Sequence, residues 1–203
     1  PRLNRVREAQ LVQPAIRLHH HRAQPSPGPH RSRHRGAALE DALDRIGRHA
    51  IHDLSSSLDR AAEAHATIMG REMAAETDAT GLDRATLRPE TCTYLEDADR
   101  IDAAAHAVAL RVADEWRAEV EALLEEHDIL VAPAATGEAP PASSTGDPTP
   151  GRPWSLMGLP TVSVPFACGP AGLPVGLQVI GALGCDDLVL TVGDLVSASS
   201  MPE

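Results

Sequence analysis

The chain has 203 residues, 42% of them hydrophobic but only 2% aromatic, and a net charge of −11. The charge is uneven, because residues 1–36 carry +7 and the remaining residues carry −18. Nucleic-acid affinity depends on clustered Lys and Arg that neutralise phosphates, so the acidic body argues against a nucleic-acid partner. No run approaches the ~20 apolar residues of a membrane span, and we expect no membrane partner either.

The cysteines are three in number and far apart, at Cys92, Cys168 and Cys185. They form no Cys-x-x-Cys pair, which argues against a disulfide framework or a zinc ribbon and favours a reducing cytoplasm. The length allows one domain with a real core, or part of a larger one. The amino end shows no apolar signal core. The sequence begins at Pro1 rather than Met, which we interpret as truncation upstream.

Residues 1–36 combine a His triplet at His19, a Pro-rich stretch from Pro25 and a His- and Arg-rich run from His30, without helical or alternating apolar spacing. This composition predicts an unstructured lead, above all from about Leu18 to Gly36. Two other interpretations stay open. The lead could be a metal-binding or nucleic-acid tail, or residues 14–36 could be translated out of frame, since Arg-rich, Lys-free usage implies GC-rich codons.

From Ala37 onward the pattern becomes that of a folded domain, which we take to span residues 37–203. Apolar residues recur at helical spacing up to Ile46, and Gly47 follows as a stop. Residues 50–54 predict a strand, and a helix that leads through a glycine into a strand is half of a parallel βαβ layer. A second, Ala-rich helix is predicted at residues 58–76.

The strongest periodic signal runs from Tyr94 to Glu126, where apolar residues recur every three or four positions. It predicts one long helix with one buried face. A buried strand is predicted at residues 128–132, ending at Pro133. Residues 134–153 are rich in Pro, Gly, Ser and Thr and predict a long irregular connection, of the kind that is usually functional or mobile.

Three further elements complete the predicted fold. Thr161–Phe166 and Val175–Gly181 are expected to be partner strands, and Asp186–Val196 a closing helix, with glycines at the turns between them. The fold class predicted from this order is α/β, with a mixed sheet flanked by helices.

Three motifs in the last third carry a family resemblance. They are DILVAP from Asp128, GRPWSLMGLPTVSVPFACGP from Gly151 and GLPVGLQVIGALGCDD from Gly172. In this order and spacing they resemble the carboxyl-terminal portion of the amidase signature family, and a weaker likeness extends back to Ala37. The resemblance implies a partial amidase-signature fold.

Members of that family hydrolyse carboxylic amides with a serine nucleophile, a second serine joined through a cis peptide, and a lysine, all of which precede the region resembled. A serine hydroxyl needs a base, and a lysine with a lowered pKa can serve as one. All 18 basic residues of this chain are arginine, whose guanidinium stays protonated. We therefore expect no catalytic residue here and no activity from the chain alone. The intact parent would act on a small-molecule amide without metal or organic cofactor, and could form a homodimer.

The resemblance also implies a substrate-binding segment. In the family, the loop around WSLMGLP helps to wall the acyl pocket, which makes six residues substrate-proximal candidates: Trp154, Ser155, Leu156, Gly158, Leu159 and Pro160. The alternative is that Gly158 and Pro160 only shape a turn before the Thr161 strand. Two departures bear on pocket chemistry: many relatives carry Asn where this chain has Ser155, and the acidic turn at Cys185 lacks the basic neighbour often seen before it.

Other reactive side chains have ordinary explanations. Ser143-Ser144 and Ser55-Ser56-Ser57 lack the flanking glycines that let backbone N–H groups approach an oxyanion, so they predict a loop and a helix cap. His49 and His52, with Asp53, do not point to a metal site, since a spacing of three on a strand puts the two rings on opposite faces.

Two rival functions remain. The first is a non-catalytic interaction module that binds a partner through the 94–126 helix. Such a module would leave no apolar surface exposed, whereas a fragment of an enzyme should bind a hydrophobic dye. The second is a remnant of the amidotransferase subunit that shares the fold, although the stretch Thr145 to Pro148 looks more like free-standing amidases.

Overall fold

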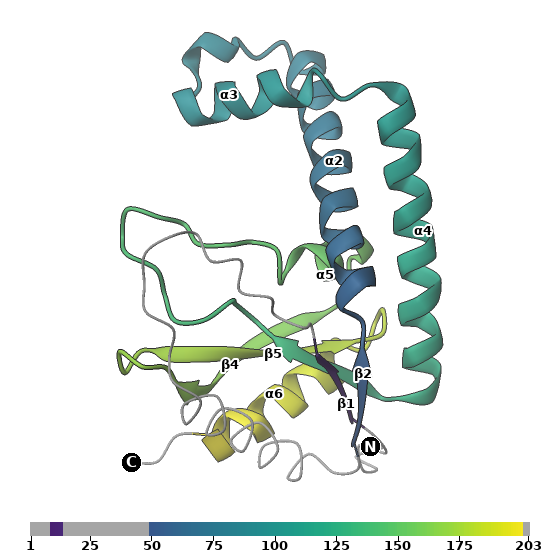
Figure 1. Ribbon diagram of the computed structural model, residues 1–203, viewed down its shortest axis with the longest axis vertical. Helices are drawn as coiled ribbons and strands as arrows, with labels where there is room; N and C mark the ends of the chain where they lie inside the picture. The colour runs from purple at the N-terminus through teal and green to yellow at the C-terminus, as the bar shows by residue number, and fades with distance from the viewer. Residues whose placement is uncertain (1–8, 14–48, 201–203) are drawn as a thin grey trace.

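The computed structural model describes residues 9–13 and 49–200, with the strands at 9–13 and 49–53 described by their backbone. A five-stranded sheet has the order β2-β1-β3-β5-β4. Its strands are β1 (Ala9–Gln13), β2 (His49–Asp53), β3 (Ile129–Pro133), β4 (Thr161–Cys168) and β5 (Pro174–Gly181). Helices α2, α4 and α5 cover one face of this sheet and α6 covers the other (Figure 1). The predicted α/β class with a mixed sheet flanked by helices is confirmed.

The parallel part of the sheet is built on β1, which pairs with β2 on one side and with β3 on the other. β2 confirms the predicted strand at 50–54, one residue earlier than expected. The unstructured lead predicted for residues 1–36 is wrong for Ala9–Gln13. Leu11 is in register with both Ile51 and Val131, so partners distant in sequence stabilise a strand that is too short to show a pattern of its own. Residues 14–48, including the helix predicted after Ala37, lie outside the described residues.

The antiparallel part confirms three predicted strands, β3, β4 and β5. β5 lies between β3 and β4 and pairs antiparallel with both, as expected for the predicted strand partners. The register of β4 shifts between Pro165 and Ala167. Pro165 has no N–H to donate, which an edge strand tolerates and a central strand does not.

One face of the sheet packs against α6 (Asp186–Ser200), which confirms the predicted closing helix. Its core consists of buried residues from three strands and the helix: Ile129, Val131, Val164, Leu177, Val179, Val189, Val192 and Val196. The helix approaches closely at Gly193, where a Cβ atom would lie 2.7 Å from Val162 Cγ1. Asp186 and Asp187, the acidic turn noted in the sequence, form the first turn of α6, where negative charge favours the helix dipole.

The opposite face packs against a helical hairpin. α2 (Ser55–Ala79) and α4 (Ala103–Glu126) run antiparallel, side by side, and project well beyond the sheet (Figure 1). Small residues let them approach, and their contact cluster is Ala64, Ile68, Ala109 and Ala113. The helix predicted at 58–76 is confirmed and is longer at both ends. Ser55-Ser56-Ser57 were expected to cap it, but they form its first turn, and Leu54 holds the cap position without a side-chain hydrogen bond.

The prediction of one long helix from Tyr94 to Glu126 is wrong. The chain forms α3 (Pro89–Ala98) and α4, which are separate helices. Asp102 ends the break, because its side chain accepts a hydrogen bond from Ala105 N at 2.7 Å and so caps α4. Ile101 still packs on the cluster around Leu95, which is why the apolar period continues across the gap.

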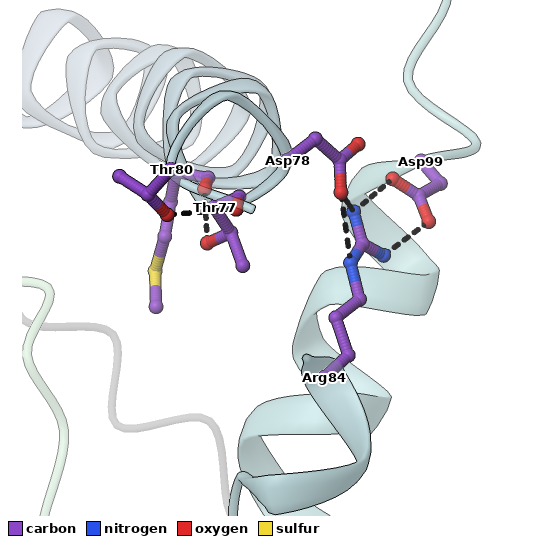
Figure 2. A network of polar contacts seen from close by, with 6 residues as sticks. Thr77, Asp78, Thr80, Arg84 and Asp99 are labelled. Atoms are coloured by element: carbon purple, nitrogen blue, oxygen red, sulfur yellow. Dashed lines mark hydrogen bonds and ion pairs between the residues drawn. The ribbon is translucent and has the colours of Figure 1, made fainter. Parts of the chain in front are cut away.

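A charged network closes the distal end of the hairpin (Figure 2). Arg84, in the short 3-10 helix η1 (Arg84–Thr86), bonds Asp78 at the end of α2 at 2.8 Å and Asp99 just after α3 at 2.6 Å. The hydrogen bond from Arg84, followed by its charge, holds the pKa of Asp99 below its ordinary value, and the two carboxylates raise the pKa of Arg84. One guanidinium therefore joins two helix ends.

The cap on α4 can be tested with Asp102→Ala. Removal of the bond to Ala105 N should lower the free energy of unfolding by about 1 kcal/mol, measured by urea denaturation followed by circular dichroism. Asp114→Ala is the matched control, since Asp114 is exposed on the same helix and pairs with Arg117 three residues away. Such a pair contributes roughly 0.5 kcal/mol or less, so equal losses from the two variants would contradict the capping role.

The network at Arg84 predicts a specific pH dependence. Because the pKa of Asp99 is lower in the folded chain than in the unfolded chain, its contribution is complete above the ordinary carboxyl pKa of about 4. It is lost as the pH falls through the lowered value. Asp99→Asn should therefore be less stable than the parent at neutral pH and should lose less stability on acidification. The same denaturation series on both chains is the measurement, and identical curves for Asp99→Asn and the parent would exclude the coupling.

Candidate functional site

The six substrate-proximal candidates lie in one segment, formed by the short helix α5 (Arg152–Met157) and the turn that follows it. The connection predicted as irregular over 134–153 is irregular up to Gly151, where this helix takes over. Pro153 in the first turn is compatible with a helix start, where no N–H is needed. Gly158 ends the helix with φ of 66°, and its N–H bonds Ser155 O at 3.1 Å.

Trp154 anchors this segment in the core. Its side chain is only 2% exposed, and its ring centroid lies 5.4 Å from that of Trp116 on α4, tilted by 55°. Trp116 Nε1 also donates a hydrogen bond to Pro153 O at 3.1 Å. A tilted aromatic pair contributes about 0.5–1.5 kcal/mol beyond the area it buries. Together the two contacts fix α5 against the helical hairpin.

The remaining candidates divide between core and surface. Leu156 and Leu159 are half-buried against the helical cluster, whereas Ser155 and Gly158 are exposed. Pro160 precedes β4, and its carbonyl accepts a hydrogen bond from Gly181 N at 3.1 Å. The turn-shaping role predicted as the alternative for Gly158 and Pro160 is therefore observed. A role in an acyl pocket stays a prediction for all six.

The region where α2 meets α5 holds buried ring nitrogens beside a positive charge. Burial, and secondly the positive charge of Arg152, lower the pKa of His65, so its imidazole is neutral at neutral pH. Among the described residues, neither His65 Nδ1 nor Trp154 Nε1 has a hydrogen-bond partner, although both atoms are buried. Two buried ring nitrogens, one on α2 and one on α5, are therefore not hydrogen-bonded to the described part of the protein.

Two residues that organise this region were missed from the sequence. Gln178 on β5 is 5% exposed, and its Nε2 donates to Pro133 O and to Pro150 O, each at 3.0 Å. Glu138 in the long connection accepts hydrogen bonds from Ala171 N at 2.8 Å and Leu173 N at 3.0 Å, in the turn between β4 and β5. The sequence did contain a sign of the role of Gln178, because it is the one polar residue inside the apolar run VGLQVI. No feature of the sequence pointed to Glu138.

The other reactive side chains are placed as follows. Ser143-Ser144 lie in the connection, as predicted, and Ser144 Oγ accepts a hydrogen bond from Gly146 N at 3.1 Å. His49, His52 and Asp53 lie on β2, and their side chains are outside what the structure describes. Among the side chains that the structure describes, residues 54–198, no group of three or more metal-ligating residues comes together. None of the helices described is long and apolar enough to cross a membrane.

Comparison with known proteins identifies the family, since a family model described as Amidase matches residues 37–190. The chain belongs to the amidase family. An indoleacetamide hydrolase of Allorhizobium ampelinum is 50% identical over 44 residues, which are 22% of this chain and 10% of that protein. A glutamyl-tRNA(Gln) amidotransferase subunit of Sorghum bicolor is 42% identical over 84 residues, 36% of this chain and 15% of that protein.

Solved amidase-family structures share the fold over almost the whole chain. A structure described as an amidase superposes with a TM-score of 0.68 and 26% identity, covering 83% of this chain and 42% of that one. The corresponding glutamyl-tRNA(Gln) amidotransferase subunit of Thermotoga maritima gives a TM-score of 0.69 at 20% identity, with coverages of 95% and 42%. The chain thus spans less than half the length of these amidase-family proteins.

The turn after α5 can be tested with Gly158→Ala. A side chain at φ of 66° is strained, so the variant should lose about 1 kcal/mol of stability. Gly137→Ala is the matched control, since a Cβ there meets nothing within 4 Å and its φ lies outside the left-handed region. Fluorescence-detected unfolding is a suitable measurement, because Trp116 and Trp154 are the two tryptophans of the chain. Equal stability of both variants would show that the turn carries no strain.

Proposed function

We propose that this chain is the carboxyl-terminal part of an amidase-family hydrolase that cleaves a carbon–nitrogen amide bond of a small molecule. The observation that carries the proposal is the family match over residues 37–190, together with a fold that matches less than half of intact relatives. In this proposal the chain supplies part of the sheet, the helical hairpin and one wall of the acyl pocket.

The chemistry of the proposed parent divides between two parts. Amide hydrolysis through an acyl-serine needs a serine, a base that takes its proton, and N–H donors for the oxyanion. This chain contains no lysine, and arginine cannot act as the base. The nucleophile and its base would therefore come from residues outside this chain, and the reaction would need no metal or organic cofactor.

The proposed wall is the segment from Trp154 to Pro160. Trp154 is locked in the core, so the exposed Ser155 and Gly158 are held on a rigid support. A rigid support is what substrate positioning requires, because a displacement of about 1 Å can cost roughly 10²-fold in rate. We further propose a cytoplasmic location and a homodimeric parent.

A second candidate is a remnant of an amidotransferase subunit. It is supported by the likeness to the Sorghum bicolor protein over 84 residues. The stretch Thr145 to Pro148 resembles free-standing amidases instead, so the hydrolase ranks first. The interaction module is less well supported, since the single helix of residues 94–126 on which it depended is two helices.

The proposal predicts that the purified 203-residue chain releases no ammonia from simple aliphatic and aromatic amides. An extended protein that adds an upstream region with a glycine-flanked tandem serine and a lysine should hydrolyse at least one of them. Ammonia release measured against a heat-denatured control checks both statements. Turnover by the chain alone that a single substitution such as Ser155→Ala abolishes would place the nucleophile here and overturn the proposal.

A further inference from the structure

Gln178 is a buried polar side chain in an apolar environment. Along β5, Leu177 and Val179 face α6, so the alternating Gln178 and Ile180 face the helices on the other side. The side chain is 5% exposed, and a buried amide without partners would destabilise the fold. The hydrogen-bond partners of Gln178 therefore indicate its structural role.

The two N–H groups of this amide bond the two ends of the long connection. One partner is the carbonyl of Pro133, the last residue of β3, and the other is that of Pro150, immediately before Gly151 and α5. Both distances are 3.0 Å, so the donor capacity of the NH₂ group is used in full.

The chain also stays beside β5 just after β3 ends. Ala134 N donates to Gly176 O at 2.9 Å, and a Cβ at Gly176 would lie 3.0 Å from Ala134 Cβ. The start of the connection therefore lies directly on β5, two residues before Gln178. A longer route away from the strand would break both contacts.

The proposed wall, together with residues 150–153 that lead into it, is consequently bonded to β5 at both ends. Gln178 holds the carbonyl of Pro150, and Gly181 N holds that of Pro160 at 3.1 Å. Ser155 and Gly158 lie exposed between these two attachments. We expect loss of the first attachment to let the residues that lead into α5 shift relative to the sheet, whereas the second attachment stays in place.

We propose that Gln178 is a positioning residue that sets acyl-group selectivity by holding the 150–160 segment at a fixed place over the sheet. This inference rests on the proposed function. Glutamine suits the position because it offers two donors on a side chain of the right length. Glutamate would bring its oxygens against two carbonyls, and methionine would leave both carbonyls without a donor.

Glu138 offers a contrast within the same connection. Its carboxylate ties the early part of the connection to the turn between β4 and β5, at an exposed site and far along the chain from α5. Glu138→Leu should therefore loosen the connection without displacing the wall. A comparison of substitutions at Gln178 and Glu138 therefore distinguishes a displacement of the wall from a general loosening of the connection.

The first test is hydrogen exchange on the full 203-residue chain carrying Gln178→Met. Amides of residues 151–159 should exchange faster, whereas those of β3, β5 and α6 keep the parent's rates. Val192→Ala is the matched control, because it weakens the core on the α6 face without touching the connection. If the two variants show the same distribution of exchange, Gln178 has a general structural role and the proposal is wrong. Gln178→Asn, one carbon shorter, replaces the methionine variant if that does not fold, with the same expected pattern.

The second test uses the extended, active protein and a series of amides that differ in acyl length. Gln178→Met should change the ratio of KM values between long and short acyl groups by about tenfold, with kcat unchanged within about twofold, which is the signature of altered binding. Glu138→Leu and Val192→Ala should leave that ratio unchanged. A uniform loss of kcat, or an unchanged KM ratio, would overturn the selectivity role. If the extended protein hydrolyses no amide, the proposed function fails and selectivity fails with it, while the exchange experiment still decides whether Gln178 positions the segment.

Discussion

The structure depends on the placement of β5, which has neighbours on both edges and on both faces. β3 and β4 pair with it antiparallel, α6 packs on one side of it and the helical layer on the other. Leu177, Val179 and Ile180 are fully buried, and burial of each such side chain contributes about 1.5–3 kcal/mol. A strand enclosed in this way cannot shift its register by one residue without exchanging its two apolar faces. It therefore gives the molecule a fixed reference to which the less regular parts are attached.

The helical layer is attached to that reference through α5. The Trp116–Trp154 contact and the hydrogen bond from Trp116 to Pro153 join α5 to α4, and Leu58 and Ala61 of α2 lie in the same cluster as both rings. The distal end of the hairpin is closed by ion pairs instead, in which Arg84 bonds the exposed carboxylates of Asp78 and Asp99. Exposed pairs contribute little to stability, so the proximal, apolar end determines how the hairpin sits on the sheet.

Local sequence could predict the elements whose signal lies within their own residues. β3, β4, β5 and α6 are short apolar or periodic runs between glycines and prolines, and each was found. β1 could not be found, since five residues without a pattern become a strand only through β2 and β3. The break before Asp102 was hidden because Ile101 keeps the apolar period, although the capping aspartate was there to be noticed. The six candidate residues were assigned from a single sequence segment, and their role stays a prediction. The burial of Trp154 depends on Trp116, and the contacts of Gln178 depend on two carbonyls that are distant in sequence, so neither could be predicted locally.

Both hydrogen bonds from Gln178 go to backbone carbonyl groups, those of Pro133 and Pro150. Every residue offers a backbone carbonyl, so the bonds from Gln178 do not require a particular side chain at positions 133 or 150. The side chains between these points can therefore vary while both ends of the connection stay attached to β5. Ser155 is on the exposed side of α5, next to the buried Trp154. A fold that holds the backbone of this segment from one central strand thus leaves its exposed side chains free to vary.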